Sequence, residues 1–134
     1  MRHDTITLTL PAAPEYARTV RMTASALVSR TSLSYEGVED VRIAAEEVFV
    51  YASECAGYEG QVTLEFSRGV DCFEIRVRLG NEIRATDEED ERRTAYATFI
   101  LQSVCDRFEI YTDLDGEHLR IAKNLPVEPG DEER

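Results

Sequence analysis

The chain has no tryptophan and no uninterrupted apolar run close to the roughly 18 to 20 residues that cross a bilayer. Its first residues, MRHDTITLTLPAAP, alternate Thr with Ile and Leu and lack the continuous apolar segment of a signal peptide. We therefore expect a cytoplasmic protein with no membrane association.

Basic residues are scarce: 15 Lys and Arg stand against 27 Asp and Glu, which gives a formal net charge of −12. Nucleic acid and anionic lipid would be repelled by such a chain, so neither is an expected partner. A basic protein surface is the better complement. With 43% hydrophobic and 31% charged residues in 134, the composition is that of one globular domain.

Cysteine and histidine are also few and show no metal-binding spacing. Cys55, Cys72 and Cys105 are odd in number, far apart and embedded in apolar segments, which predicts buried, reduced thiols. His3 and His118 have no partner at metal spacing, and we expect both at the surface. No metal site is predicted.

Phosphate-binding and cation-binding loops are missing as well. The sequence has no Walker-type or GxGxxG loop. The acidic run DEEDE, Asp87 to Glu91, lacks the glycine and the alternating ligands of a calcium loop. It belongs to GNEIRATDEEDERR, which has no apolar periodicity and is predicted to be a mobile, solvated loop.

Hydrophobic periodicity predicts three helices and five strands. The predicted helices are Glu15 to Ser29, a second one that contains Glu39 to Ala56 with Ser34 as its N-cap, and Thr94 to Cys105. The predicted strands are Thr5 to Leu10 with Ile6, Leu8 and Leu10 buried, Val62 to Phe66, Phe73 to Leu79, and a hairpin that turns at Asp115–Gly116.

This element order predicts an α/β (α+β) two-layer sandwich, in which a mostly antiparallel sheet of about five strands is covered on one face by three helices. We expect one domain over residues 1–125 and a disordered acidic tail over 126–134. The second helix is apolar on two sides, with Ile43 and Val50 nearly opposite its main apolar face, so we expect it to be central.

The second helix also carries the strongest candidate for acid–base chemistry. At 100° per residue, Glu47 lies on one edge with Tyr51 and Glu54, whereas Glu46 points elsewhere. A carboxylate at that edge, beside apolar faces, is expected to have a raised pKa and is a candidate general base. The alternative is an ordinary, partly solvated helix glutamate.

The element order, together with LPAAPEYARTVRMTASAL, VEDVRIAAEE, QSVCDRFEI and GEHLRIAKNL, resembles the anti-sigma factor serine-protein kinases. These are histidine-kinase-like (GHKL, Bergerat-fold) ATPases, and the resemblance spans Leu8 to Leu125. It implies a Bergerat-type fold. It also implies that Glu47 stands where the family has the base that activates a substrate serine, and that Arg21 matches an arginine that contacts the protein partner.

The positions that hold the nucleotide in this family are altered here. The resemblance places Tyr51 on the magnesium-binding asparagine, Leu79 on the aspartate that reads adenine, and Asn81 and Ile83 on the two glycines that follow. A register shifted by one residue would keep Gly80 but put Arg78 in the aspartate's place.

The lid and the last strand depart from the family pattern too. Ala95 and Ala97 replace lid glycines, and Glu117 and His118 stand where the family has a threonine. A phenol is a poor Mg²⁺ ligand, and backbone that must approach phosphates closely uses glycine.

Three hypotheses follow from these departures. The first is a degenerate anti-sigma-type regulator that binds a sigma factor or an anti-anti-sigma (STAS-type) protein, needs neither ATP nor Mg²⁺, and has Glu47 as a relic. The second is a divergent but active ATP-dependent serine-protein kinase. The third is a sensor or scaffold with a repurposed pocket. The resemblance also makes a homodimer possible.

Overall fold

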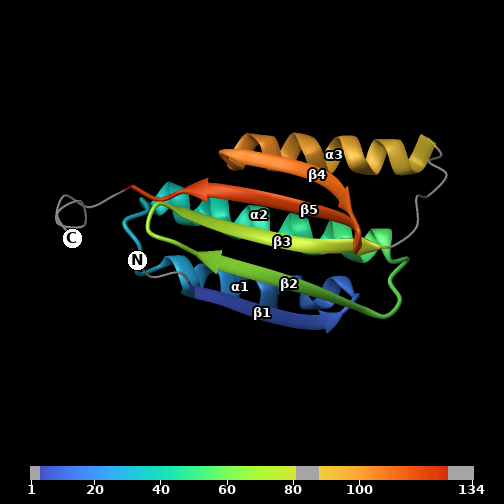
Figure 1. The fold of residues 1–134 in the computed structure, drawn as a ribbon, viewed down its shortest axis with the longest axis horizontal. Coiled ribbons are helices and arrows are strands. Elements are labelled where there is room, and N and C mark those ends of the chain that lie inside the picture. Colours follow the sequence, from blue (N-terminus) through green and yellow to red (C-terminus); the bar gives the residue numbers. More distant parts are fainter. Residues whose placement is uncertain (1–3, 81–87, 127–134) are drawn as a thin grey trace.

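The computed structural model describes residues 4–80 and 88–126. Within these ranges the chain forms five strands, three α-helices and one short 3-10 helix (Figure 1). In chain order they are β1 (Asp4–Pro11), the 3-10 helix η1 (Pro14–Tyr16), α1 (Ala17–Val28), α2 (Tyr35–Cys55), β2 (Gln61–Arg68), β3 (Cys72–Gly80), α3 (Glu88–Val104), β4 (Arg107–Asp113) and β5 (Gly116–Asn124).

The five strands form one antiparallel sheet in the order β1-β2-β3-β5-β4. The register pairs Leu8 with Leu64 and Ile75 with Ile121 across neighbouring strands. All three helices lie behind the sheet in Figure 1, with α2 between α1 and α3. The predicted two-layer sandwich of Bergerat type is confirmed.

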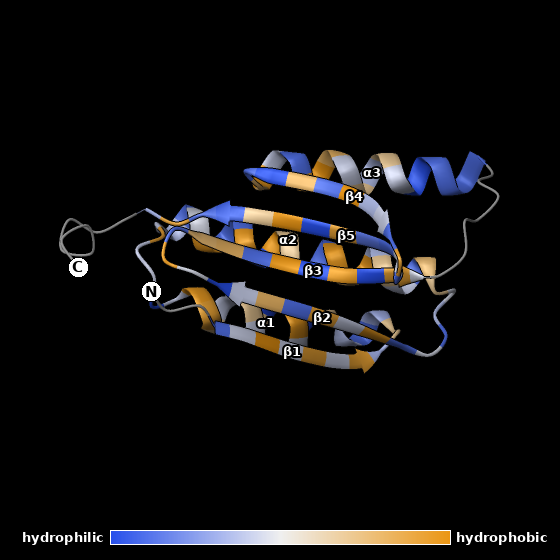
Figure 2. Ribbon diagram, viewed as in Figure 1, coloured by the Kyte–Doolittle hydropathy of each residue, from blue (hydrophilic) through white to orange (hydrophobic). Residues whose placement is uncertain are grey.

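Strict alternation places the core between the sheet and the helices. Inward residues of β2 and β3 are almost fully buried, and polar residues alternate with them along each strand (Figure 2). The buried positions are Val62, Leu64, Phe66, Phe73, Ile75, Val77 and Leu79. β1 behaves differently: Leu10 is buried, but Ile6 and Leu8 are only half-buried, because β1 is an edge strand.

The helix α2 is central, as predicted, and packs on α1, on α3 and on the sheet. Ser34 caps it by accepting a hydrogen bond from the backbone N–H of Gly37. Val50 packs against the core, whereas the side of α2 that carries Ile43 is open to solvent and leaves this residue 44% exposed.

The prediction of a loop before the third helix is wrong for the residues that the structure describes. Residues Glu88 to Arg93 form the first turns of α3, and residues 81–87 lie outside the described residues. Carboxylates in the first turn of a helix interact favourably with its positive N-terminal dipole, so the acidic run that lacks apolar periodicity is nonetheless helical.

Within the described residues Cys55, Cys72 and Cys105 form no disulfide, as predicted, but each is only half-buried. Burial raises the pKa of Cys105 to about 12 and also raises the pKa of Cys72. Both are therefore protonated at neutral pH and poor nucleophiles. The predicted tail, apart from Pro126, lies outside the described residues.

Candidate functional site

The candidate site lies along the edge of α2 that faces α3. Glu47, Tyr51 and Glu54 follow one another at helical spacing, so their side chains lie on one side of α2. The N-terminal half of α3 supplies the facing residues, because Thr94 contacts Tyr51 and Arg93 contacts Glu54. The site is thus an interhelical seam, and its geometry depends on how α3 sits against α2.

Tyr51 is the most buried member of this seam. Its side chain belongs to the hydrophobic core and the residue is only 5% exposed. Its hydroxyl oxygen lies 2.9 Å from Oγ1 of Thr94, so the one polar atom of the side chain has a partner inside the protein. Burial raises the pKa of Tyr51 to about 12, and the phenol is therefore neutral at physiological pH.

A charged contact closes the same seam one turn further along. Nε of Arg93 donates to Oε2 of Glu54 at 3.0 Å, and Nη1 of the same guanidinium donates to Oδ1 of Asp90 at 2.7 Å. Arg93 therefore links two carboxylates, one on each helix. We call the set Tyr51, Glu54, Asp90, Arg93 and Thr94 the α2–α3 clasp.

Glu47 lies one turn before Tyr51 and is half-buried. Burial raises its pKa above the usual value, and the negative charges of Glu54 and Glu46 raise it further. This direction agrees with the raised pKa predicted from the sequence. Glu46 lies on a different side of α2, where its carboxylate faces Arg21, so the predicted separation of the two glutamates is also confirmed.

The other predicted nucleotide positions are scattered between the core and the surface. Leu79 is the penultimate residue of β3 and is 7% exposed within the hydrophobic core, and its side chain offers no hydrogen-bonding group. Ala97 is buried under α3, but Ala95 is exposed on its outer side. Asn81 and Ile83 lie outside the described residues.

Arg21 lies on α1, away from the clasp. Its Nη1 is 3.6 Å from Oε2 of Glu46, which is an ion pair too long for a strong hydrogen bond. Within residues 4–80 and 88–126, its buried Nε has no hydrogen-bond partner. Because this Nε is buried, the Nη atoms of the half-buried side chain are the ones that could bind another group.

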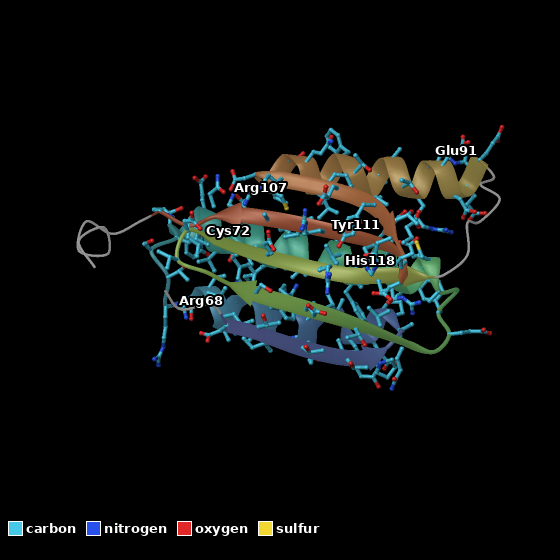
Figure 3. All side chains as sticks on the ribbon, viewed as in Figure 1. Arg68, Cys72, Glu91, Arg107, Tyr111 and His118 are labelled. Carbon is cyan, nitrogen blue, oxygen red and sulfur yellow. The ribbon has the colours of Figure 1, made fainter. Side chains whose placement is uncertain are left out.

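His118 was predicted to be exposed, and this is wrong. It lies on β5 and is only 6% exposed, because the Tyr111 ring of β4 stacks on its imidazole at 5.2 Å (Figure 3). Its Nε2 lies 2.9 Å from Oδ1 of Asp113, at the end of β4. Cross-strand pairing of Tyr111 with His118 explains the burial of His118, which no local sequence pattern in β5 predicts.

Comparison with known proteins adds to this geometry. A model of the histidine kinase-like ATPase domain matches residues 10–123. The chain belongs to the histidine kinase-like ATPase domain family. The resemblance to serine-protein kinases is confirmed as well, because this domain is 32% identical over 128 residues to the serine-protein kinase RsbW of Listeria innocua, an alignment that covers 83% of this chain and 82% of the relative.

Two further relatives carry the same description. The serine-protein kinase RsbW of Listeria monocytogenes serovar 1/2a is also 32% identical, with the same coverage of both chains. That of Bacillus pumilus is 37% identical over 79 residues, which cover 55% of this chain and 49% of the relative.

The side chains of this histidine kinase-like domain do not match a magnesium site at Tyr51. Mg²⁺ prefers compact oxygen ligands in octahedral geometry, but the Tyr51 oxygen is buried and bonded to Thr94, and Glu54 is paired with Arg93. Across residues 4–80 and 88–126, no three His, Cys, Asp or Glu side chains are grouped as metal ligands. The Leu79 side chain likewise has no hydrogen-bond acceptor.

Among the helices of the described residues, none is both long and apolar enough to span a membrane.

The sequence pattern points to Tyr51 and Glu47 but not to Arg93 and Thr94, because these two fall in a predicted loop and at the start of a predicted helix with no known neighbour. The Asp90–Arg93 spacing of three residues was the available local signal.

Proposed function

We propose that this chain is an anti-sigma-type regulator that acts by binding a protein, without ATP-dependent phosphoryl transfer. The observation that carries the proposal is the buried Tyr51 phenol, bonded to Thr94 at the position where the resemblance places a magnesium ligand. A regulator of this kind keeps the fold of its kinase relatives and works through its surface in the cytoplasm.

Two further features support a site without nucleotide. At the position that the resemblance assigns to adenine reading stands the buried, apolar Leu79, whose side chain cannot accept a hydrogen bond from the adenine amino group. The first turn of α3 carries Glu88, Glu89, Asp90 and Glu91. Carboxylates there would repel a triphosphate, although salt screening would weaken the effect.

Isothermal titration of Mg-ATP into the full chain tests the first part of the proposal. We expect no saturable heat, with a related serine-protein kinase RsbW run in parallel as the positive control. Micromolar binding that requires Mg²⁺ would overturn the proposal, because it would mean that the nucleotide site works with ligands other than those of the family.

The partner is proposed to be a sigma factor or an anti-anti-sigma (STAS-type) protein, with Arg21 as an anchor. The loose 3.6 Å contact with Glu46 leaves the guanidinium able to pair with a carboxylate or phosphate of the partner. Titrating both classes of protein from the same organism gives the test. Arg21→Ala should weaken binding at least about tenfold, as expected for an interface anchor. Arg18→Ala, an exposed arginine on the same helix, should change it little.

A divergent, active serine-protein kinase is the second candidate, because one observation favours it. Glu47 occupies the position of the family's base and has a raised pKa, as a general base requires. Labelled ATP incubated with this chain and an anti-anti-sigma protein would give a labelled product under this hypothesis, and Glu47→Gln would abolish the labelling.

A homodimer stays a prediction, which light scattering can test.

A further inference from the structure

The helix α3 is apolar on two opposite faces. One face is buried against the rest of the protein through Ala97 and Leu101, which are 2% and 0% exposed. On the other face, Tyr96 and Phe99 are 64% and 70% exposed. At 100° per residue, Phe99 lies almost directly opposite the buried pair, and Tyr96 lies beside Phe99. Two large exposed aromatic rings on one helix face are typical of a binding surface.

The place of α3 in the fold leaves this face open. α3 lies at one edge of the helical layer and α1 at the opposite edge, with α2 between them (Figure 1). The α2–α3 clasp holds the N-terminal half of α3, so Tyr96 and Phe99 are presented on a fixed helix. The face is also remote in the layer from Arg21, which lies on α1.

Charge around the two rings selects the partner's chemistry. The first turns of α3 add three exposed glutamates, Glu88, Glu89 and Glu91, against one exposed arginine, Arg92, which at 100° per residue lies on the same side of the helix as Phe99 (Glu91 is labelled in Figure 3). Glu89 lies on the same side of the helix as Tyr96, two turns away. An anionic membrane or a nucleic acid would be repelled by this face, and by the net charge of −12.

A second copy of the chain is also a poor occupant. Two such faces would bring the glutamates of each copy together. The two rings offer on the order of 250 Å² of exposed surface, far below the roughly 800 Å² per partner of a standard stable interface. A short segment of a basic protein would be attracted by the glutamates, and it needs less contact area than a stable dimer does.

We propose that the outer face of α3, built on Tyr96 and Phe99 and flanked by Glu88 and Glu89, docks a basic polypeptide segment that carries apolar side chains. The apolar side chains pack on the two rings and the basic groups pair with the glutamates. This surface is separate from Arg21 and does not depend on the proposed function. With both surfaces occupied, one chain would hold two different proteins.

The test uses the full chain and a labelled peptide about five helical turns long, with Leu at amphipathic spacing and Lys elsewhere. Fluorescence anisotropy measures its affinity, and a peptide with Glu in place of Lys is the charge control. The double variant Tyr96→Ser/Phe99→Ser removes the two rings. Its matched control is Met22→Ser/Tyr35→Ser, which removes two apolar side chains that are 53% and 82% exposed on other helices.

We expect the Lys–Leu peptide to bind, with at least about a tenfold loss in the ring variant and less than about a twofold loss in the control. Amide shifts in an NMR titration should centre on α3. Three results would overturn the proposal: equal affinity for both double variants, which would indicate diffuse charge attraction; equal binding of the Glu–Leu peptide; or a dimer that Tyr96→Ser/Phe99→Ser dissociates, which would make a second copy the occupant.

Discussion

The hydroxyl oxygen of Tyr51 and Oγ1 of Thr94 lie 2.9 Å apart, and this hydrogen bond joins the C-terminal part of α2 to α3. The contact gives a buried phenol its partner inside the protein, so that no polar atom of Tyr51 requires solvent. It also places an ordered side-chain pair at the position that the sequence resemblance assigns to a magnesium ligand. The seam between the two helices is therefore closed by the protein's own side chains.

Replacing Tyr51 with Phe tests the energetic role of this hydrogen bond. The ring stays buried, but Oγ1 of Thr94 loses its partner, and we expect the free energy of unfolding to fall by about 1 kcal/mol. Urea denaturation at neutral pH measures the change. Tyr96→Phe is the matched control, because its ring is 64% exposed, and it should change stability by less than about 0.5 kcal/mol. Equal effects of the two variants would contradict the role given to the Tyr51–Thr94 pair.

Replacing Arg93 with Ala should loosen the N-terminal half of α3. Only Ala97 and Leu101 of this helix are fully buried, so its first turns depend on the contacts of Arg93 with Glu54 and Asp90. We expect faster amide hydrogen exchange over residues 88–94, with the C-terminal turn of α3 unchanged.

The exposed Arg92 supplies the control for this prediction, since Arg92→Ala removes the same charge from the same helix. High salt should speed the exchange of the wild-type segment in the same direction, because partly exposed ion pairs are screened. If Arg93→Ala exchanges like Arg92→Ala over residues 88–94, the ion pairs do not hold the helix.

Most of the fold could be predicted because it rests on local periodicity. Alternation in Val62 to Phe66 and Phe73 to Leu79 identified both strands and their buried faces, and Ser34 marked the start of α2. The same periodicity separated Glu47 from Glu46. These features depend on neighbours a few positions apart in the chain.

The remaining features depend on contacts between distant residues, which periodicity does not contain. Arg93 pairs with Glu54, which lies 39 residues earlier in the chain. This contact and the helix dipole stabilise a helix in a segment whose sequence is typical of a solvated loop. Similarly, His118 is buried because Tyr111 on the paired strand covers it. Half-burial of Ile6 and Leu8 follows from the edge position of β1, which the sequence order alone does not reveal.

The raised pKa of Glu47 makes stability depend on pH in a defined direction. Burial and the neighbouring charges of Glu54 and Glu46 raise this pKa in the folded protein above the usual value of a glutamate. Between that value and the raised one, the folded state binds more protons than the unfolded state. The Glu47 contribution to stability is therefore present at low pH and lost as the pH rises through this window.

Glu47→Gln removes this dependence, because an amide does not titrate. We expect the variant to gain stability over the wild type as the pH rises from 4.5 towards 7, measured by urea denaturation at a series of pH values. Glu59→Gln, an exposed glutamate in a turn, controls for the loss of one negative charge. A Glu47→Gln profile parallel to that of the wild type would contradict the raised pKa.

The buried imidazole of His118 should contribute to the stability of the β4–β5 hairpin. His118→Ala removes both the stacking on Tyr111 and the hydrogen bond to Asp113, and we expect the free energy of unfolding to fall by about 2 kcal/mol. His118→Phe keeps an aromatic ring but loses the hydrogen bond, so about 1 kcal/mol of that loss should remain. Thermal and urea denaturation give both values. Full wild-type stability in His118→Phe would mean that stacking alone holds the ring, because the Asp113 carboxylate would then be dispensable.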